Sequence, residues 1–261
     1  MSWASDLFAS LPGDPVFWAS AVVAVLLTGV SKGGVGGMAL FAVPIMALSI
    51  SPVTAAAIML PILVVMDWFA AWTYRRTFDR TVVLRMMPAA LLGIGIGWAL
   101  AGSISEDGVR IAVGLIAVAF PLWQWLGPKD GISGVADSAP AGWLAGLVAG
   151  FTSFLAHAGG PPFKAYALPY GQRRGLSPEV FAGSAVMFFF VVNAAKLVPY
   201  AALGQFDRAN VATSLALIPL APVGVLIGAW IVRRMDARVF YPLIYTLVFA
   251  TGVKLLWDGV V

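Results

Sequence analysis

The sequence lacks cysteine altogether and contains a single histidine in 261 residues. The absence of cysteine excludes disulfides, thiolate catalysis and iron–sulfur ligation. One histidine, with no HExxH motif and no paired-histidine spacing, argues against a structural zinc site. No GxxxxGK[ST] motif is present to hold a nucleotide phosphate. We therefore expect no metal, no cofactor and no step driven by ATP.

Charged residues are scarce as well, at 11% of the chain against 61% hydrophobic residues. Soluble domains are about a quarter charged and about half apolar. Apolar runs of about 20 residues, the length that crosses a bilayer, recur along the whole chain. The sequence therefore predicts an all-α polytopic membrane protein. The net charge of +4 could suggest nucleic acid, but the arginines lie in short clusters between apolar runs, which is how membrane proteins encode their orientation.

Six apolar segments have the length of a complete membrane crossing. They are residues 53–74, 82–101, 109–126, 179–203, 211–232 and 239–257. Two further regions, 18–48 and 143–170, are too long for one span and are each interrupted by glycine. The two arms of the first region would measure roughly 21 Å and 16 Å as helices, so neither crosses about 30 Å of hydrocarbon alone.

The two halves of the chain resemble each other at an offset of about 126 residues. The matching positions, in order, are the glycine pairs 33–34 and 159–160, the stretches SPVTAAA (51–57) and SPEVFAG (177–183), Asp67 and Asn193, and the FDR tripeptides at 78–80 and 206–208. Their common order predicts an internal duplication. Its repeats are residues 1–126 and 143–261, joined by a polar linker at 127–142.

The distribution of arginine predicts that the two repeats are inverted. Basic loops stay in the cytoplasm. The loop after 53–74 is rich in arginine and its counterpart near 205 is not, whereas the loop near 233 is basic and its counterpart near 105 is acidic. Equivalent loops then lie on opposite faces, so each half must cross the membrane an odd number of times. Three full spans plus a hairpin that enters and leaves on the same side satisfy this condition. We therefore predict re-entrant helical hairpins at 18–48 and 143–170, a cytoplasmic linker and two extracytoplasmic termini.

The glycine-rich breaks in these hairpins form the predicted binding site. Irregular backbone survives at membrane depth where it is buried in protein or lines a wet cavity, and broken helices at equivalent positions of inverted halves mark a transporter's substrate site. The helix after each break points its N-terminus toward the membrane centre, which favours an anion. The predicted ligands are Ser31, Lys32, Gly33, Gly34, Gly36, Gly37, His157, Gly159, Gly160, Lys164, Asn193 and Lys196. The simpler alternative is that the glycines only allow close helix packing.

Two polar residues are candidates for proton coupling. His157 belongs to the residue type whose unperturbed pKa, about 6.5, lies in the working range of a cell. Asp67 lies at membrane depth, where an ionisable group is a functional candidate by default. The structural alternatives are a satisfied core histidine and, for Asp67, a buried ion pair or a hydrogen bond across helices. Lys196 could likewise extend to a lipid headgroup instead of a substrate.

Four stretches of the sequence, taken in order, match the pattern of one transporter family. They are TGVSKGGVGGMALFAVPIMA and SPVTAAAIMLPI in the first half, and GLVAGFTSFLAHAGGPPFKAYALP and LSPEVFAGSAVMFFFVVNAAKLVPY in the second. In these the chain resembles the sulfite exporter TauE/SafE family, also called the 4-toluene sulfonate uptake permease family. The resemblance implies movement of a sulfur-containing anion, such as sulfite or an organosulfonate, across the bacterial cytoplasmic membrane. HAGGPPF is less glycine-rich than KGGVGG and carries the histidine, which leaves open whether the two breaks contribute equally and which anion is carried.

The sequence thus favours a secondary transporter over two alternatives. A passive anion channel would also use a positive midplane, and flux driven against a gradient would distinguish the two. A membrane-embedded enzyme would need a nucleophile–base or metal constellation, for which this composition offers little, so we expect no enzyme. The expected partners are the lipid bilayer and a small anion, with room for a homodimer and no nucleic acid.

Overall fold

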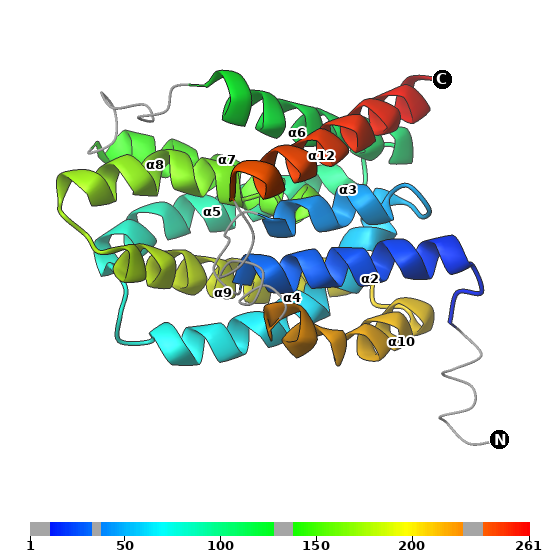
Figure 1. The fold of residues 1–261 in the computed structure, drawn as a ribbon, viewed down its shortest axis with the longest axis horizontal. Coiled ribbons are helices and arrows are strands. Elements are labelled where there is room, and N and C mark those ends of the chain that lie inside the picture. The colour runs from blue at the N-terminus through cyan, green and yellow to red at the C-terminus, as the bar shows by residue number, and fades with distance from the viewer. Residues whose placement is uncertain (1–10, 33–37, 128–137, 227–236) are drawn as a thin grey trace.

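The computed structural model describes residues 11–32, 38–127, 138–226 and 237–261, and the side chains within these ranges outside 237–244. Over these residues the secondary structure is helical, with no strand. The helices run side by side along the long axis of the molecule (Figure 1). The prediction of an all-α protein is therefore confirmed.

Among the described residues, five helices are long and apolar enough to cross a membrane. They are α4 (Pro52–Tyr74), α5 (Arg80–Ala101), α6 (Glu106–Leu126), α7 (Ala139–Ala156) and α9 (Pro178–Ala202). A sixth crossing results if α10 (Arg208–Leu217) and the helix Leu220–Leu226, which are bent by 40°, are taken as one span. The multi-pass membrane protein predicted from composition is thus confirmed.

The predicted spans correspond to these helices with small differences at their ends. Residues 53–74, 82–101, 109–126 and 179–203 match α4, α5, α6 and α9 to within three residues. The predicted span 239–257 lies within α12 (Ala237–Val260). The predicted span 211–232 is the bent pair, and its last residues, from 227, lie outside the described ranges.

The outer surface of the bundle is apolar, as lipid contact requires. Trp68, Phe69 and Trp72 on α4 are 63%, 70% and 67% exposed. A soluble protein would rarely expose so many large apolar side chains together. We conclude that this face of α4 meets the hydrocarbon of the bilayer.

Helix starts in the two halves use the same capping residues. Ser51 and Ser177 each accept a hydrogen bond from the N–H three residues on, at 3.1 Å and 3.3 Å, and each is followed by a proline in the first turn. Asp79 and Asp207, from the two FDR tripeptides, cap α5 and α10 in the same way at 2.9 Å and 2.8 Å. Such side-chain caps replace missing backbone acceptors in the first helical turn. The Ser and Asp residues that align between the two halves of the sequence therefore cap corresponding helices.

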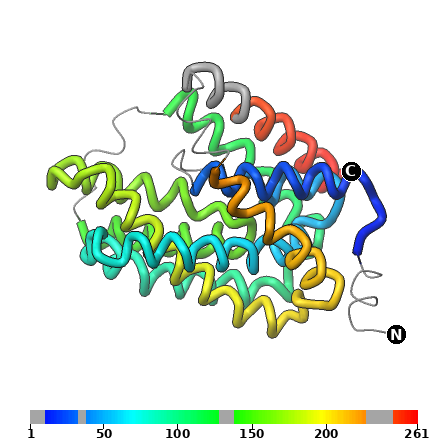
Figure 2. Tube along the Cα trace, turned by 60° about the horizontal axis from the view of Figure 1, so that its bottom comes forward, coloured from blue at the N-terminus to red at the C-terminus, as the bar shows by residue number. Residues whose placement is uncertain are grey.

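Two elements are interrupted near the middle of the bundle. The first is α2 (Pro15–Val30), followed after the break by a 3-10 turn (Met38–Phe41) and α3 (Ala42–Met46). The second is α7, followed after His157–Gly159 by α8 (Gly160–Arg173). Figures 1 and 2 show α2 and α3 running toward one end of the bundle, and α7 and α8 toward the other. Gly33, Gly34, Gly36 and Gly37 lie outside the described residues.

The two ends of the bundle differ in charge. The arginine end, toward which α7 and α8 run, carries Arg75, Arg76, Arg80, Arg173 and Arg174 around the helix ends. The acidic end carries Asp14, Glu106, Asp107 and Asp207 at the starts of α2, α6 and α10. The start of α2 and the C-terminus both lie at the acidic end (Figure 1).

The most extensive helix contact joins α5 of the first half to α7 of the second. Gly93 on α5, and Gly146 and Gly150 on α7, lie so close to the facing helix that a Cβ would stand 2.0–2.3 Å from a backbone carbonyl oxygen. Small residues of this kind allow helix backbones to approach closely inside a membrane. Close glycine packing therefore occurs between α5 and α7, whereas the glycines within 33–37, for which it was considered as an alternative, lie outside the described residues.

Candidate functional site

A central cavity of about 390 Å³ lies where the two interrupted elements meet α4 and α9. Its wall includes residues from both breaks, which are more than a hundred positions apart in sequence. The predicted site residues that line it are Ser31, Lys32, His157, Gly160, Lys164 and Asn193. The fold therefore gathers these six predicted residues around one space.

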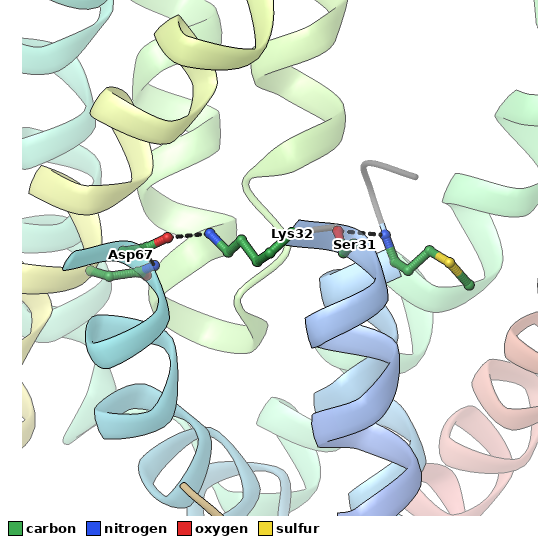
Figure 3. Close-up of polar contacts among 5 residues, drawn as sticks. Ser31, Lys32 and Asp67 are labelled. Atoms are coloured by element: carbon green, nitrogen blue, oxygen red, sulfur yellow. Dashed lines mark hydrogen bonds and ion pairs between the residues drawn. The ribbon is translucent and has the colours of Figure 1, made fainter. Parts of the chain in front are cut away.

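Asp67 on α4 lies at the edge of this cavity, completely buried and held by two donors (Figure 3). The Lys32 ammonium forms an ion pair with Oδ1, and Asn193 Nδ2 donates a hydrogen bond to Oδ2 at 2.5 Å. The buried ion pair foreseen as the structural alternative for Asp67 is therefore present. Asp67 and Asn193 are also the residues that align between the two halves, so the aligned positions touch each other at the centre of the molecule.

Ser31 ties together the two sides of the first break. Its hydroxyl accepts a hydrogen bond from the Met38 N–H at 3.2 Å (Figure 3). Ser31 and Lys32 lie in a π-helical turn at the end of α2, a wider winding that occurs frequently at functional sites. This winding ends α2 with Lys32 directed toward α4.

His157 ends α7 with a left-handed backbone, at φ 53°, and is the single non-glycine residue with a positive φ in the described ranges. Its Nε2 lies 2.9 Å from the carbonyl oxygen of Ala56, which only accepts hydrogen bonds, so Nε2 carries the hydrogen. Nδ1 then accepts from Lys196 at 2.6 Å. In this arrangement the ring is the neutral tautomer with its hydrogen on Nε2. A strained backbone at a non-glycine residue is typical of functional sites.

Lys196 lies behind the wall of the central cavity rather than in it. The side chain is fully buried, and its ammonium donates to the carbonyl oxygen of Ser153 at 2.9 Å and to the Ser153 hydroxyl at 3.0 Å. Together with the contact to His157, these bonds occupy the three donors of an ammonium group. In this structure Lys196 holds the second break in place instead of reaching the cavity.

Lys164 is the second lysine of the cavity wall. It lies early in α8, and no ion pair or hydrogen bond joins it to another of the described residues. Lys32, by contrast, is already paired with Asp67. Lys164 therefore supplies the cavity with a positive charge that no protein carboxylate in the described ranges neutralises.

The two glycines at the start of α8 differ in their surroundings. A Cβ on Gly160 would meet nothing within 4 Å, because Gly160 borders the open space of the cavity. A Cβ on Gly159 would stand 2.6 Å from the carbonyl oxygen of Ala149 and 2.9 Å from the Phe189 ring. Gly159 is thus a packing residue and Gly160 faces the site. Proline at 161 and 162 removes two backbone donors, so α8 offers an anion fewer N–H groups than an ordinary helix N-terminus.

Several lining residues were not predicted from the sequence. They are mostly apolar or aromatic: Ala39, Leu40, Leu63, Tyr74, Ser153, Phe163, Pro178, Phe181, Ala182, Ala185, Val186 and Phe189. Ser153 precedes His157 by four positions on α7, so the helical spacing of i and i+4 could have identified it. The aromatic side chains carried no such signal, because apolar residues occur on every face of these helices.

A second cavity of about 540 Å³ lies toward the acidic end. It is lined by Ser51 and Thr54 at the start of α4, Glu106 at the start of α6, and Tyr200 and Gln205 at the end of α9. The Tyr200 hydroxyl donates to the carbonyl oxygen of Phe154 at 2.6 Å.

Tyr200 and Phe154 line the second cavity on the side where His157 and Ser153 line the central one. Both residues are buried, and their ring centroids are 5.4 Å apart. The Tyr200 ring also stacks on His157 with centroids 6.4 Å apart, and His157 lines the central cavity. The two cavities therefore come within about one turn of α7 of each other.

Comparison with known proteins gives one match. The family described as Sulfite exporter TauE/SafE matches residues 21–255, a range that includes both breaks and every candidate site residue. No match was found among curated proteins or among solved structures.

Proposed function

This chain belongs to the sulfite exporter TauE/SafE family, and from that premise we propose that it is a secondary transporter of a small sulfur-containing anion in a bacterial cytoplasmic membrane. The central cavity is the binding site. The observation that carries the proposal is the charge around it. Lys32 and Lys164 line the cavity, and the neighbouring carboxylate, Asp67, is already engaged by Lys32 and Asn193.

The shape and lining of the cavity favour an organosulfonate over sulfite. A volume of about 390 Å³ falls within the range of sites for organic ligands, about 300–1,000 Å³. Phe163, Phe181 and Phe189 line it together with the polar residues. A sulfonate group would bind near Lys32 and Lys164, and an apolar substituent would bury surface against the aromatic side chains. Sulfite, which has no such substituent, would bind more weakly.

We propose that the fold consists of two inverted repeats with re-entrant hairpins. Three observations support this arrangement. The pairs α2–α3 and α7–α8 run toward opposite ends of the bundle (Figure 1). The aligned residues Asp67 and Asn193 touch at the centre. Tyr74 lines the central cavity, whereas Tyr200, which lies 126 positions later and so matches it at the offset of the repeat, lines the second. The arginine end would then face the cytoplasm, with both termini outside.

The presence of two cavities supports a carrier rather than a channel. A channel needs one continuous path through the membrane. Here the two cavities are distinct, and the layer of Tyr200 and Phe154 lines the second on the side of the central one. We propose that the structure corresponds to a state open toward the arginine end, and that transport moves this layer so that the second cavity becomes the exit.

The electrical gradient of a cell favours export of the anion. Moving one negative charge out of a cell that is negative inside releases about 2.3 kcal/mol per 100 mV. Export of the anion alone would therefore need no coupling ion, whereas uptake would need one; an anion that moves together with one proton carries no net charge and gains nothing from the potential. His157 and Asp67 remain the candidate proton carriers, and His157 could gain a second proton only after Lys196 had moved away from Nδ1.

Counterflow in proteoliposomes tests the proposal. Vesicles loaded with unlabelled 4-toluenesulfonate should accumulate the labelled anion transiently, because a carrier exchanges one anion for another and a channel does not. Lys164→Gln should lose most of this counterflow. Lys254→Gln is the matched control, since Lys254 pairs with Asp258 on the surface of α12. Labelled anion that equilibrates without accumulation would establish a channel, and no flux of sulfonate or sulfite would overturn the proposed substrate class.

A further inference from the structure

We infer that Asp67 is a resident counter-anion of the binding site, which the transported anion displaces from Lys32 and which takes up a proton as it is displaced. The inference rests on the proposed function, because it requires that an anion binds in the central cavity. It goes further by naming what that binding does to the site. The result is a fixed link between one anion and one proton.

The structural basis is that Lys32 both lines the central cavity and forms the ion pair with Asp67. Its side chain lines the central cavity and is 17% exposed, while the carboxylate that it holds is completely buried. While Lys32 is in place the Asp67 side chain has no accessible surface, so its Oδ1 can be reached from the cavity only after Lys32 has moved. An anion that approaches Lys32 therefore competes directly with Asp67 for the same ammonium group.

Two anions cannot share Lys32 without a large penalty. Unit charges about 5 Å apart at an effective dielectric constant of about 20 repel strongly enough to change an equilibrium constant by about 250-fold. Addition of one proton to Asp67 removes this repulsion. The proton comes from the solvent and binds Oδ1, the oxygen that Lys32 vacates, and no other bond is made or broken. Anion and proton then favour each other's binding by the same factor.

Asn193 fits both states of the carboxyl group. Its Nδ2 donates to Oδ2 at 2.5 Å, and Oδ2 accepts that hydrogen bond whether Asp67 is a carboxylate or a neutral acid. A second aspartate at this position would instead have repelled the charged form. The amide in the second repeat thus keeps Asp67 in place while its charge changes.

The other ionisable groups around Asp67 come from four elements. They are Lys32 from α2, His157 from the end of α7, Lys164 from α8 and Lys196 from α9. Of the other helices that pack on α4, α3 contains no ionisable residue, and α6 and α10 carry theirs in the first turns, as Glu106, Asp107, Arg110 and Arg208. His157 is held neutral by Lys196. Asp67 is thus the carboxylate that an anion in this cavity would meet among the described residues.

Proton uptake on anion binding tests the inference. Purified protein in weakly buffered detergent solution is mixed with methanesulfonate or 4-toluenesulfonate, strong-acid anions that keep one charge over the working pH range. The wild type should take up close to one proton per bound anion, and its affinity should fall as pH rises. Asp67→Asn should bind without proton uptake, with a flat pH profile and up to about 250-fold higher affinity at alkaline pH, since the repulsion is gone.

Asp258→Asn is the matched control, because it removes the carboxylate of an exposed lysine–aspartate pair on α12. It should behave as the wild type. Equal proton uptake in wild type and Asp67→Asn would overturn the inference and leave the proposed transporter standing. Failure of both proteins to bind sulfonates or sulfite would overturn the proposed function as well.

An infrared measurement keeps the inference testable if Asp67→Asn cannot be purified. Addition of either sulfonate to the wild type should produce the C=O stretching band of a protonated carboxylic acid in the difference spectrum. Absence of that band at saturating anion would overturn the inference without any variant.

Discussion

The two lysines of the second half, Lys164 and Lys196, should respond in opposite ways to replacement by methionine. Methionine retains most of the length of the side chain and removes the charge. Lys164 faces the central cavity without a partner among the described residues, whereas Lys196 is buried and gives its hydrogen bonds to Ser153 and His157. We therefore expect Lys164→Met to weaken anion binding and Lys196→Met to weaken the fold.

The expected loss of anion affinity in Lys164→Met follows from Coulomb's law. Two opposite unit charges about 4 Å apart attract by about 4 kcal/mol at an effective dielectric constant of about 20. Water in the cavity screens part of this attraction, and a loss of about 2 kcal/mol corresponds to a Kd about 30-fold weaker. The melting temperature should not change, because no described contact of the Lys164 ammonium is lost.

The expected loss of stability in Lys196→Met follows from the buried polar groups that lose their hydrogen-bond donor. Its removal deprives the Ser153 carbonyl, the Ser153 hydroxyl and the Nδ1 of His157 of their donor. Each buried polar group that is left without its hydrogen-bond partner costs about 1–3 kcal/mol, so the three together cost at least about 3 kcal/mol. At about 2–4 °C per kcal/mol for a chain of this size, the melting temperature should fall by roughly 10 °C.

Both variants are measured in the same two assays. Tryptophan fluorescence during heating gives the melting temperature, since the chain contains ten tryptophans. Titration with 4-toluenesulfonate gives the Kd. The reasoning is refuted if Lys196→Met melts like the wild type while Lys164→Met binds like the wild type.

Two further predictions concern the second break and the orientation of the chain. Gly159→Ala should lower the melting temperature, because its Cβ would meet backbone at 2.6 Å, while Gly160→Ala should leave it unchanged and weaken anion binding; the reverse order would contradict the placement of the two glycines. Single cysteines give labels without background because the natural chain has none. Arg76→Cys and a cysteine within 233–238 should react with an impermeant maleimide from the cytoplasm, and Arg208→Cys from outside, whereas reaction of the first two from opposite faces would discard the inverted repeats.

The spans and the breaks could be predicted from the sequence because their causes are local. Crossing length depends on the number of consecutive apolar residues, and α4, α5, α6 and α9 start at Ser or Asp caps that are visible in the sequence. The second break occurs where glycine and proline follow His157. The alignment of Asp67 with Asn193 also followed from spacing alone.

The contacts inside the site could not be predicted, because they depend on the rotation and depth of each helix. Asn193 and Lys196 are one turn apart on α9, yet Asn193 reaches the central cavity and Lys196 points behind it to Ser153. Apolar residues surround α9 on all sides, so the sequence gives no amphipathic face from which to read its orientation. The pairing of Lys32 with Asp67 was hidden for the same reason.

The close packing of α5 against α7 has a consequence for how the protein is made. The ribosome completes α5 well before α7, so the Gly93 face of α5 must first meet lipid or the insertion machinery and can reach its partner only after the second half has entered the membrane. Neither half contains both sides of this contact. A gene divided between the codons for Gly127 and Ser138 should therefore yield two fragments that are each degraded when synthesised alone and that accumulate together when both are present.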